Sequence, residues 1–245
     1  MSGQMDIWGF VPARGGSKSI PLKNLVDVGG RPMLDYSVLA AMASGRLSRV
    51  IVSTDSNRIA QRARLLGVDV DNRPTELSGD EVLVDNVVKE FLERTSTTSS
   101  LPDALALIQP TSPFLLPKHF VQLFDALEAR PDALSAHNVV AVPPIAHAWN
   151  QRWINENGEI EYIFPEQRKL VRQKQDKPDL KILGNLLVTR CEAYLSGKGV
   201  YAEPSIGVEI DRPYDFDLDG PDDLVIARAL ISAGAVDLSH LDQTT

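Results

Sequence analysis

The residues best suited to chemistry stand near the N-terminus, in the segment PARGGSKSIPLKNL at positions 12–25. Gly15-Gly16 permits a tight turn with positive φ and lets the backbone come close to a ligand. The cations and hydroxyls around this pair are Arg14, Lys18, Lys23, Ser17 and Ser19. Backbone N–H groups of a glycine turn and flanking cations together form a concave anion site. The segment therefore predicts a loop that binds a polyphosphate, such as that of a nucleoside triphosphate.

Two well-known phosphate loops do not fit this segment. A P-loop requires G-x-x-x-x-G-K-[ST], but Lys18 follows Ser17 without the earlier glycine, and the dinucleotide fingerprint G-x-G-x-x-G is absent. A surface loop with solvated charges is the alternative interpretation. The loop directly follows an expected strand at 7–11, which favours phosphate binding, because open α/β sheets bind ligands beyond the carboxyl ends of their strands.

Strand and helix patterns alternate along the first 140 residues and resume near residue 186. Short apolar runs predict strands at 7–11, 49–53, 68–70, 104–108, 133–142, 186–189 and 208–211. Helical spacing predicts helices at 33–43, 56–66, 82–92, 117–129 and 221–231, and the Ser/Thr-rich run 95–100 is expected to be a loop. The alternation predicts an α/β fold with a mostly parallel, Rossmann-like sheet and helices on both faces.

Composition narrows the class of protein. With 245 residues, 43% of them hydrophobic, the chain is long enough for one large α/β domain with its own core. The net charge of −8 disfavours a nonspecific nucleic-acid binder. No apolar run reaches the ~18 residues of a membrane span, so no membrane partner is expected. The single Cys191 fits a reducing, cytoplasmic compartment, and four histidines without metal spacing make a zinc site unexpected.

The periodic pattern weakens over 143–183. Trp149, Trp153, Tyr162 and Phe164 stand there among polar residues. We interpret this segment as an arm inserted into a single domain that spans 1–245. Aromatic side chains exposed on such an arm would form an unusual apolar patch on a monomer, so we expect a homodimer.

Five segments, taken in order, resemble the cytidylyltransferases that activate nine-carbon sugar acids, the CMP-sialic acid synthetases and their relatives. The segment PARGGSKSIPLKN is similar to the signature loop of that family. SRVIVSTD, NRPTEL with Gly79-Asp80, ALIQPTSP and DFDLDGPDDL follow it at the family's approximate spacing. Any one short segment could arise by chance, whereas four in order after a 13-residue loop form a specific signal.

The resemblance implies that CTP and a 2-keto sugar acid react to give a CMP-sugar and pyrophosphate, with attack of the anomeric hydroxyl on the α-phosphorus. Catalysis would rest on positioning and on cations, because negative charge grows on the phosphoryl oxygens and the leaving group. The resemblance also implies that the arm packs against a second subunit. A cytidylyltransferase for an eight-carbon acid and an inactive nucleotide-binding regulator are the alternatives. The 13-residue loop disfavours the first, and the presence of Arg14, Lys23, Asp217 and Asp219 disfavours the second.

The resemblance also assigns a nucleotide site. Arg14 and Lys23 are expected to hold the phosphates and Asn24 to contact the base or ribose, with a turn-forming role as the alternative for Asn24. Arg73 and Asp80 match the cytosine-recognising region, and a structural ion pair is an equally good account of Arg73. The full set is Ala13, Arg14, Gly15, Gly16, Ser17, Lys18, Lys23, Asn24, Arg73 and Asp80.

The phosphates would need a divalent cation, for which Asp217 and Asp219 are the candidate ligands. If they end a strand, their i, i+2 spacing projects both to one face, where two carboxylate oxygens suit Mg²⁺. One of the pair could also help to remove the anomeric proton. Helix capping is the alternative for Asp219 and the preferred role of Asp55. Asp222 and Asp223 are assigned to the helix terminus as well.

The sugar end departs from the family pattern. The family usually has a basic residue shortly before Asn-Gly, and its Arg and Asn grip the sugar acid, but KILGNLLV has Leu183 where the Arg is expected. Asn185 is expected to keep its role, with Lys181 or Arg172 as partner of the sugar carboxylate. This departure leaves the identity of the sugar acid open. The expected sugar-binding residues are Gln109, Thr111, Ser112, Arg172, Lys181 and Asn185.

Overall fold

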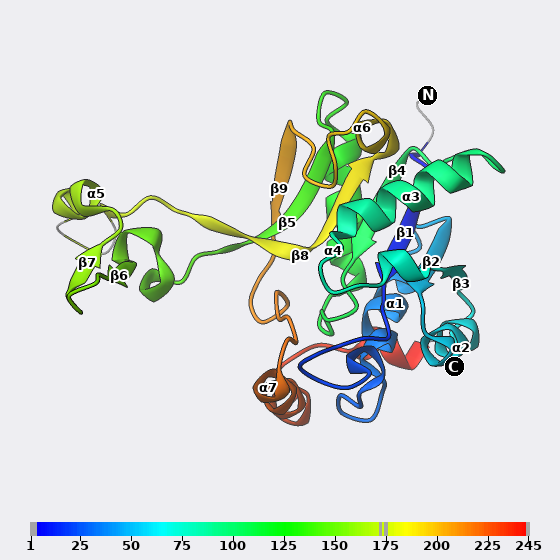
Figure 1. Ribbon diagram of the computed structural model, residues 1–245, viewed down its shortest axis with the longest axis horizontal. Coiled ribbons are helices and arrows are strands. Elements are labelled where there is room, and N and C mark those ends of the chain that lie inside the picture. Colours follow the sequence, from blue (N-terminus) through cyan, green and yellow to red (C-terminus); the bar gives the residue numbers. More distant parts are fainter. Residues whose placement is uncertain (1–3, 172, 174–175, 244–245) are drawn as a thin grey trace.

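A seven-stranded sheet forms the centre of the computed structural model, which describes residues 4–171, 173 and 176–243 (Figure 1). In sheet order the strands are β3 (Asp69–Asn72), β2 (Arg49–Thr54), β1 (Ile7–Pro12), β4 (Ala104–Ile108), β8 (Lys181–Arg190), β5 (Ser135–Ala141) and β9 (Ser205–Glu209). Neighbouring strands are parallel except at β8, which runs antiparallel to both β4 and β5. The mostly parallel α/β sheet that the sequence predicts is confirmed.

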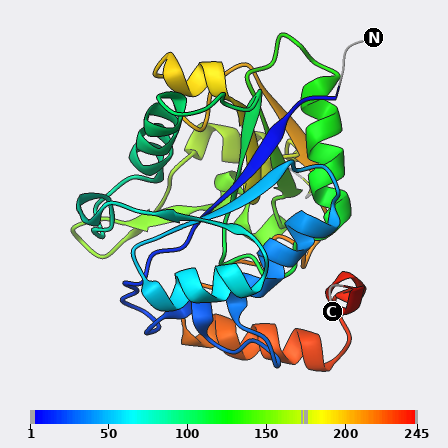
Figure 2. The same cartoon turned by 90° about the vertical axis from the view of Figure 1, so that its right-hand side faces the viewer.

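Helices cover both faces of this sheet, as Figure 2 shows. Successive strand residues point to opposite faces, so that Ile7 and Val11 of β1 enter one apolar cluster while Trp8 and Phe10 enter the other. The helices on the first face are α1 (Met33–Ala43), α2 (Asn57–Leu65) and α4 (Pro117–Glu128). Those on the second are α3 (Val84–Ser96) and α6 (Cys191–Leu195). Among the described residues, every helix is too short or too polar to cross a lipid bilayer.

A third apolar cluster lies beside the sheet and holds α7 (Pro221–Ser232). Leu218, just before this helix, is fully buried and packs with Tyr36 of α1 and Phe114 of the loop after β4. The N–H of Leu218 also donates to the carbonyl of Thr111 at 2.9 Å. These contacts bring the DFDLD segment to the carboxyl end of β4, next to the glycine loop.

Four elements differ clearly from the sequence expectation, among them β9, which spans Ser205–Glu209 rather than 208–211. α3 continues to Ser96, into the polar run expected to be a loop. β8 begins at Lys181 rather than 186, because its exposed first half pairs with β5 as a ribbon leading away from the core. The helix α6 was not predicted, since five residues are too short to show a helical period, although Cys191 and Tyr194 are buried.

The described residues of 143–180 form an arm that extends away from the sheet (Figure 1), whereas residues 181–183 belong to β8. Its elements are β6 (Arg152–Ile154), β7 (Ile160–Tyr162) and α5 (Pro165–Leu170), with β6 and β7 paired in a small antiparallel sheet. Trp153 is 58% exposed and Phe164 38% exposed. Trp149 is half-buried instead, with its ring against that of His147, so it adds less to the apolar surface than expected.

Candidate active site

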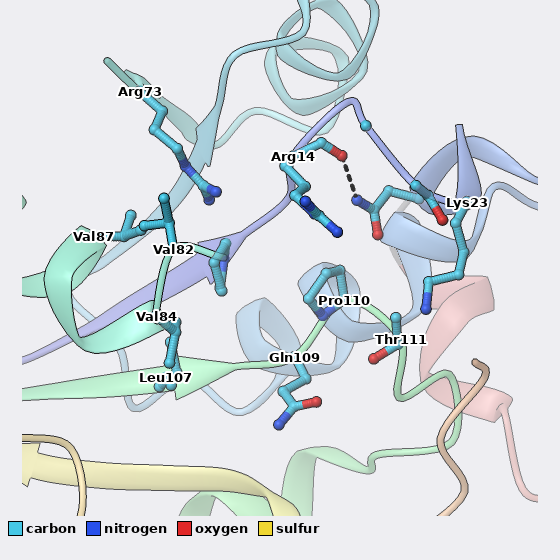
Figure 3. Close-up of a pocket in the computed structure, with 14 residues that line it drawn as sticks. Arg14, Lys23, Arg73, Val82, Val84, Val87, Leu107, Gln109, Pro110 and Thr111 are labelled. Carbon is cyan, nitrogen blue, oxygen red and sulfur yellow. Dashed lines mark hydrogen bonds between the residues drawn. The ribbon is translucent and has the colours of Figure 1, made fainter. Parts of the chain in front are cut away.

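A cavity of about 330 Å³ opens at the carboxyl ends of β1 and β4, where the sheet topology predicts a ligand. Cavities of ~300–1,000 Å³ are typical of small-molecule sites. Figure 3 shows Arg14 and Arg73 pointing into the cavity, with Lys23 and Thr111 beside its other end. The sequence-predicted residues that line it are Arg14, Gly16, Ser17, Lys23, Asn24, Arg73, Gln109 and Thr111.

Apolar side chains complete the cavity wall, and sequence reasoning did not single them out. They are Val82 just before α3, Val84 and Val87 in its first turn, and Leu107 near the end of β4. An apolar residue in a helix or strand is normally part of the core, so its presence carries no signal of a site. The wall gives the cavity an apolar side facing its cationic side, an arrangement suited to a ligand with a flat ring and an anionic tail.

The glycine loop is held in shape by hydrogen bonds to its backbone. Asn24, in a short 3-10 helix (Lys23–Leu25), is buried, and its Nδ2 donates to the Arg14 carbonyl at 3.1 Å (dashed in Figure 3). This bond supports the turn-forming role of Asn24. The expected positive φ is wrong, because neither Gly15 nor Gly16 is among the described glycines with that backbone conformation. Gly15 is required for space, since a Cβ there would lie 2.8 Å from the Cβ of Ser56.

Asp55 does not cap the following helix. The N-cap of α2 is Ser56, and its side chain makes no capping bond. The Asp55 Oδ1 atom instead accepts the N–H of Gly15 at 2.7 Å. The physical reason lies in the sheet, where β1 and β2 are parallel neighbours with Pro12 opposite Ser53, so the residues just after β2 face the loop after β1. Asp55 therefore stabilises the glycine loop.

The loop cations are paired with carboxylates from other segments. Arg14 and Lys18 both bind Asp80, with Lys18 Nζ 2.8 Å from its Oδ2. The hydrogen bonds from Lys18 and Arg14 hold the pKa of Asp80 below its ordinary value. Lys23, whose side chain is mostly buried, places its Nζ 3.2 Å from Oδ1 of Asp219. These carboxylates occupy the donors that a polyphosphate would need.

Arg73 is buried at the opposite side of the cavity, with 8% of its surface exposed. Its Nη2 donates to the Ser53 carbonyl at 2.8 Å, and its Nε donates to the Ser53 hydroxyl at 3.3 Å. Burial lowers the pKa of its guanidinium group, against the opposing effect of Asp55 and Asp71. Its hydrogen bonds go to Ser53 rather than to a carboxylate, so a direct ion pair does not account for this residue.

Asp217 carries a buried carboxylate oxygen, Oδ1, that lacks a hydrogen-bond partner among the described residues. Burial raises the pKa of Asp217, while a hydrogen bond from Thr111 lowers it and the nearby Asp219 raises it. The segment is a loop rather than the expected strand end, since β9 stops at Glu209. A hard divalent cation on Asp217 and Asp219 would remove the cost of the unpartnered oxygen, so the two residues fit a Mg²⁺ ligand pair.

The capping alternative for Asp219 is wrong. The N-cap of α7 is Gly220, and Oδ2 of Asp223 accepts the N–H groups of Asp219 and Gly220 at 2.9 and 2.8 Å. Asp223 therefore caps the helix as expected, and Asp222 lies in its first turn. The Asp219 carboxylate is exposed and left to interact with Lys23.

The expected sugar-binding residues are only partly brought together. Gln109 and Thr111 line the cavity, and Ser112 is fully buried behind them, its hydroxyl without a partner among the described residues. Asn185 lies beside Gln109, whose N–H approaches the Asn185 carbonyl at 3.5 Å. Nδ2 of Asn185 donates to the carbonyls of residues 215 and 216, at 3.2 and 3.4 Å. These bonds connect β8 to the segment before Asp217.

The two candidate cations for the sugar carboxylate stand apart from this group. Lys181 does not line the cavity, and its Nζ lies 2.9 Å from Asp179 and 2.7 Å from Glu209, both carboxylates. It sits opposite Ala141, where β5 and β8 lead towards the arm. Arg172 lies outside the described residues.

Comparison with known proteins places these features in a family. Residues 8–201 match the family model described as cytidylyltransferase. The chain is 30% identical over 230 residues to the CMP-N,N'-diacetyllegionaminic acid synthase of Legionella pneumophila, a match that covers 87% of this chain and 94% of that protein. It is 26% identical over 222 residues to the pseudaminic acid cytidylyltransferase of Campylobacter jejuni, with 90% and 94% covered.

Two further comparisons agree with this result. The N-acylneuraminate cytidylyltransferase of Escherichia coli is 25% identical over 221 residues, which cover 89% of this chain and 50% of that protein. The solved structure of CMP:2-keto-3-deoxy-manno-octonic acid synthetase complexed with CTP superposes with a TM-score of 0.69 at 18% identity, covers 94% of this chain and 99% of its own, and shares the fold. The resemblance seen in the sequence is thus confirmed, and the chain belongs to the cytidylyltransferase family.

Proposed function

We propose that the protein transfers CMP from CTP to the anomeric hydroxyl of a nine-carbon 2-keto sugar acid and releases pyrophosphate. The observation that carries this proposal is the meeting of Arg14, Lys23 and Thr111 around one cavity with an apolar wall, with Asp217 hydrogen-bonded to Thr111. The relatives named for legionaminic, pseudaminic and acylneuraminic acids support a nine-carbon substrate. An eight-carbon acid is the alternative substrate, because the structural neighbour is named for one.

The residues suggest how the transfer would be assisted. Arg14 and Lys23 would bind the phosphates and offset the charge that develops on the phosphoryl oxygens and on pyrophosphate. Asn24 and Asp55 would act by fixing the backbone of the glycine loop on which Arg14 stands. A Mg²⁺ ion held by Asp217 and Asp219 would supply further positive charge to the phosphate oxygens.

The first prediction concerns the nucleotide and the sugar acid. Pyrophosphate release is expected with CTP, Mg²⁺ and a nine-carbon 2-keto acid, and to be much slower with UTP, ATP or GTP. The measurement compares the four nucleotides at equal concentration against a panel of N-acetylneuraminic, legionaminic, pseudaminic and eight-carbon acids. Similar rates with UTP would contradict the cytosine assignment, and turnover of the eight-carbon acid alone would favour the alternative substrate.

The second prediction concerns Asp80. Asp80→Asn is expected to lower the KM for CTP by about threefold, because it removes a carboxylate that competes with phosphate for Arg14 and Lys18, and exposed ion pairs are weak. Initial rates at varied CTP and fixed sugar acid measure the change, with Glu81→Gln as the neighbouring control. A higher KM, accompanied by a smaller preference for CTP over UTP, would instead support base recognition by Asp80.

The third prediction concerns assembly. We propose that the arm joins two copies of the chain, since it exposes Ile145, Trp153, Ile154, Ile160 and Leu170, each by more than half of its surface. Light scattering at micromolar concentration is expected to give the mass of a dimer. A double charge substitution on the arm, Ile154→Asp with Ile160→Asp, is expected to give a monomer. A wild-type protein that is monomeric and fully active would mean that the arm serves another purpose.

A further inference from the structure

We propose that Asp71, which does not touch the cavity, is a positioning residue for nucleotide binding and acts through Ser53 on Arg73. The inference rests on the proposed function, because it takes Arg73 as a residue that contacts the nucleotide. Asp71 lies in β3, the edge strand of the sheet, and does not line the cavity. A chain of hydrogen bonds connects it to the cavity.

The chain of hydrogen bonds runs from α3 to the cavity through the ends of β3 and β2. Nη2 of Arg94, in α3, donates to Oδ1 of Asp71 at 2.7 Å. The hydroxyl of Ser53, in β2, donates to the other oxygen, Oδ2, at 2.7 Å. The same hydroxyl accepts from Nε of Arg73 at 3.3 Å, and the Ser53 carbonyl accepts from Nη2 of Arg73 at 2.8 Å. Each oxygen of the Asp71 carboxylate thus has its own partner.

Burial restricts this chain of hydrogen bonds to a single geometry. Ser53 is fully buried, while Asp71 and Arg73 are 7% and 8% exposed. A serine hydroxyl carries one proton, and its direction is set by the acceptor it meets. Because that proton points to Asp71, a lone pair of the oxygen is left for Nε of Arg73. Asp71 therefore fixes the orientation of a hydroxyl that holds the guanidinium plane.

Arg73 needs such an anchor because burial and a neighbouring positive charge both disfavour its charged form. Arg14 points into the same cavity, and the nearness of this second guanidinium disfavours the charged form of Arg73 (Figure 3). Asp55 and, after it, Asp71 offset this repulsion, and Asp71 does so without lining the cavity. An arginine left without its anchor would lose rotamer order and turn away from Arg14, since its side chain has several rotatable bonds.

A fixed guanidinium is able to distinguish cytosine from uracil. It carries donors only, and cytosine N3 is an acceptor where uracil N3 carries a hydrogen. A site built to make a hydrogen bond rejects an analogue that cannot accept it, provided that the donor cannot rotate away. Loosening Arg73 is therefore expected to weaken CTP binding and to reduce the preference for CTP over UTP together.

A purely structural role is the competing account, in which Asp71 joins β3 to α3 and does nothing for the cavity. The two accounts differ in what a substitution changes. Asp71→Asn removes the acceptor of the Ser53 proton and one negative charge, and a structural role would lower thermal stability alone. Glu90→Gln is the matched control, because Glu90 is the other carboxylate on Arg94, with Arg94 Nε 2.8 Å from it, and lies outside the chain to Arg73.

The test measures CTP binding by calorimetry without sugar acid in Mg²⁺ buffer, the ratio of kcat/KM for CTP over UTP, and the melting temperature. Asp71→Asn is expected to raise the Kd for CTP about tenfold, the lower end of the effect of losing a charge-assisted hydrogen bond. Its CTP over UTP ratio should fall, and its kcat at saturating CTP should stay within about twofold of the wild type. Glu90→Gln should leave the Kd and the ratio unchanged.

With Asp71→Asn and the wild type, two outcomes would overturn the inference. One is an Asp71→Asn protein that melts at a lower temperature but binds CTP normally, which assigns Asp71 a structural role. The other is a wild-type protein that binds no CTP, which would overturn the proposed function as well. Where Asp71→Asn fails to fold, Ser53→Ala interrupts the chain at its next link and leaves the Asp71–Arg94 ion pair in place. A normal Kd for CTP in a folded Ser53→Ala protein would likewise reject the inference.

Discussion

Replacing Asp219 by Asn is expected to reduce kcat by about a hundredfold or more, the loss typical of removing a group that stabilises charge in a transition state. Asn lacks the negative charge that a divalent cation requires, while its shape and its fit in the loop are the same. The helix cap is unaffected, because Asp223 rather than Asp219 supplies it. EDTA is expected to abolish turnover of the wild type. The measurement is kcat at saturating CTP and sugar acid across a Mg²⁺ titration.

Binding of Mn²⁺ in the presence of CTP, followed by electron paramagnetic resonance, gives a second readout that does not depend on turnover. Asp219→Asn and Asp217→Asn should both weaken it. Asp222→Asn is the matched control, since it removes the same charge three residues away, at an exposed position in the first turn of α7. A folded Asp219→Asn protein with normal kcat and normal Mn²⁺ binding would refute the metal role of this carboxylate.

The features that the sequence predicts well are those determined by neighbours in the chain. The strand of β1, the glycine loop and the helix Met33–Ala43 follow from a short apolar run, from local glycines and cations, and from helical spacing. Because a parallel α/β sheet binds ligands at one edge, the loop after β1 could be assigned to a ligand site from the sequence, and the family resemblance added the residues after β4. Arg14, Lys23, Gln109 and Thr111 do line one cavity.

The features that the sequence could not predict depend on which strands lie side by side. Asp55 looked like a helix cap because only its chain neighbours were visible, but the pairing of β1 with β2 turns it towards Gly15. Ser53, Asp71 and Arg94 carried no signal, since their connection to Arg73 depends on the register of β2 with β3, in which Ser53 lies opposite Asp71. The first half of β8 was missed because Gly184 and Asn185 interrupt its apolar run and because residues 181–183 are exposed.

The second large effect is expected from substitutions of the residues proposed to bind the sugar acid. A sugar-acid carboxylate in the cavity needs a cation or several donors, because an unpaired buried charge is costly. The carboxyl group of a 2-keto acid is bonded to the anomeric carbon, so in the proposed reaction it would lie near the α-phosphate and Gln109 rather than at the far end of β8. Lys181 is already paired with Asp179 and Glu209 in that distant position. Of the two proposed cations, Lys181 is therefore expected to contribute less.

Asn185→Ala is expected to raise the KM for the sugar acid about ten- to a hundredfold, the range for lost charge-assisted hydrogen bonds, and to leave the KM for CTP nearly unchanged. Lys181→Ala should change the KM for the sugar acid by less than about threefold, because exposed ion pairs contribute little. Arg172→Ala completes the set and should show the larger effect if Arg172 binds the carboxylate. Initial rates at varied sugar acid and saturating CTP separate these cases. If Asn185→Ala lowers only kcat, the role of Asn185 is to hold the segment before Asp217 in place rather than to bind the sugar. If all three variants bind the sugar acid normally, other residues hold the substrate.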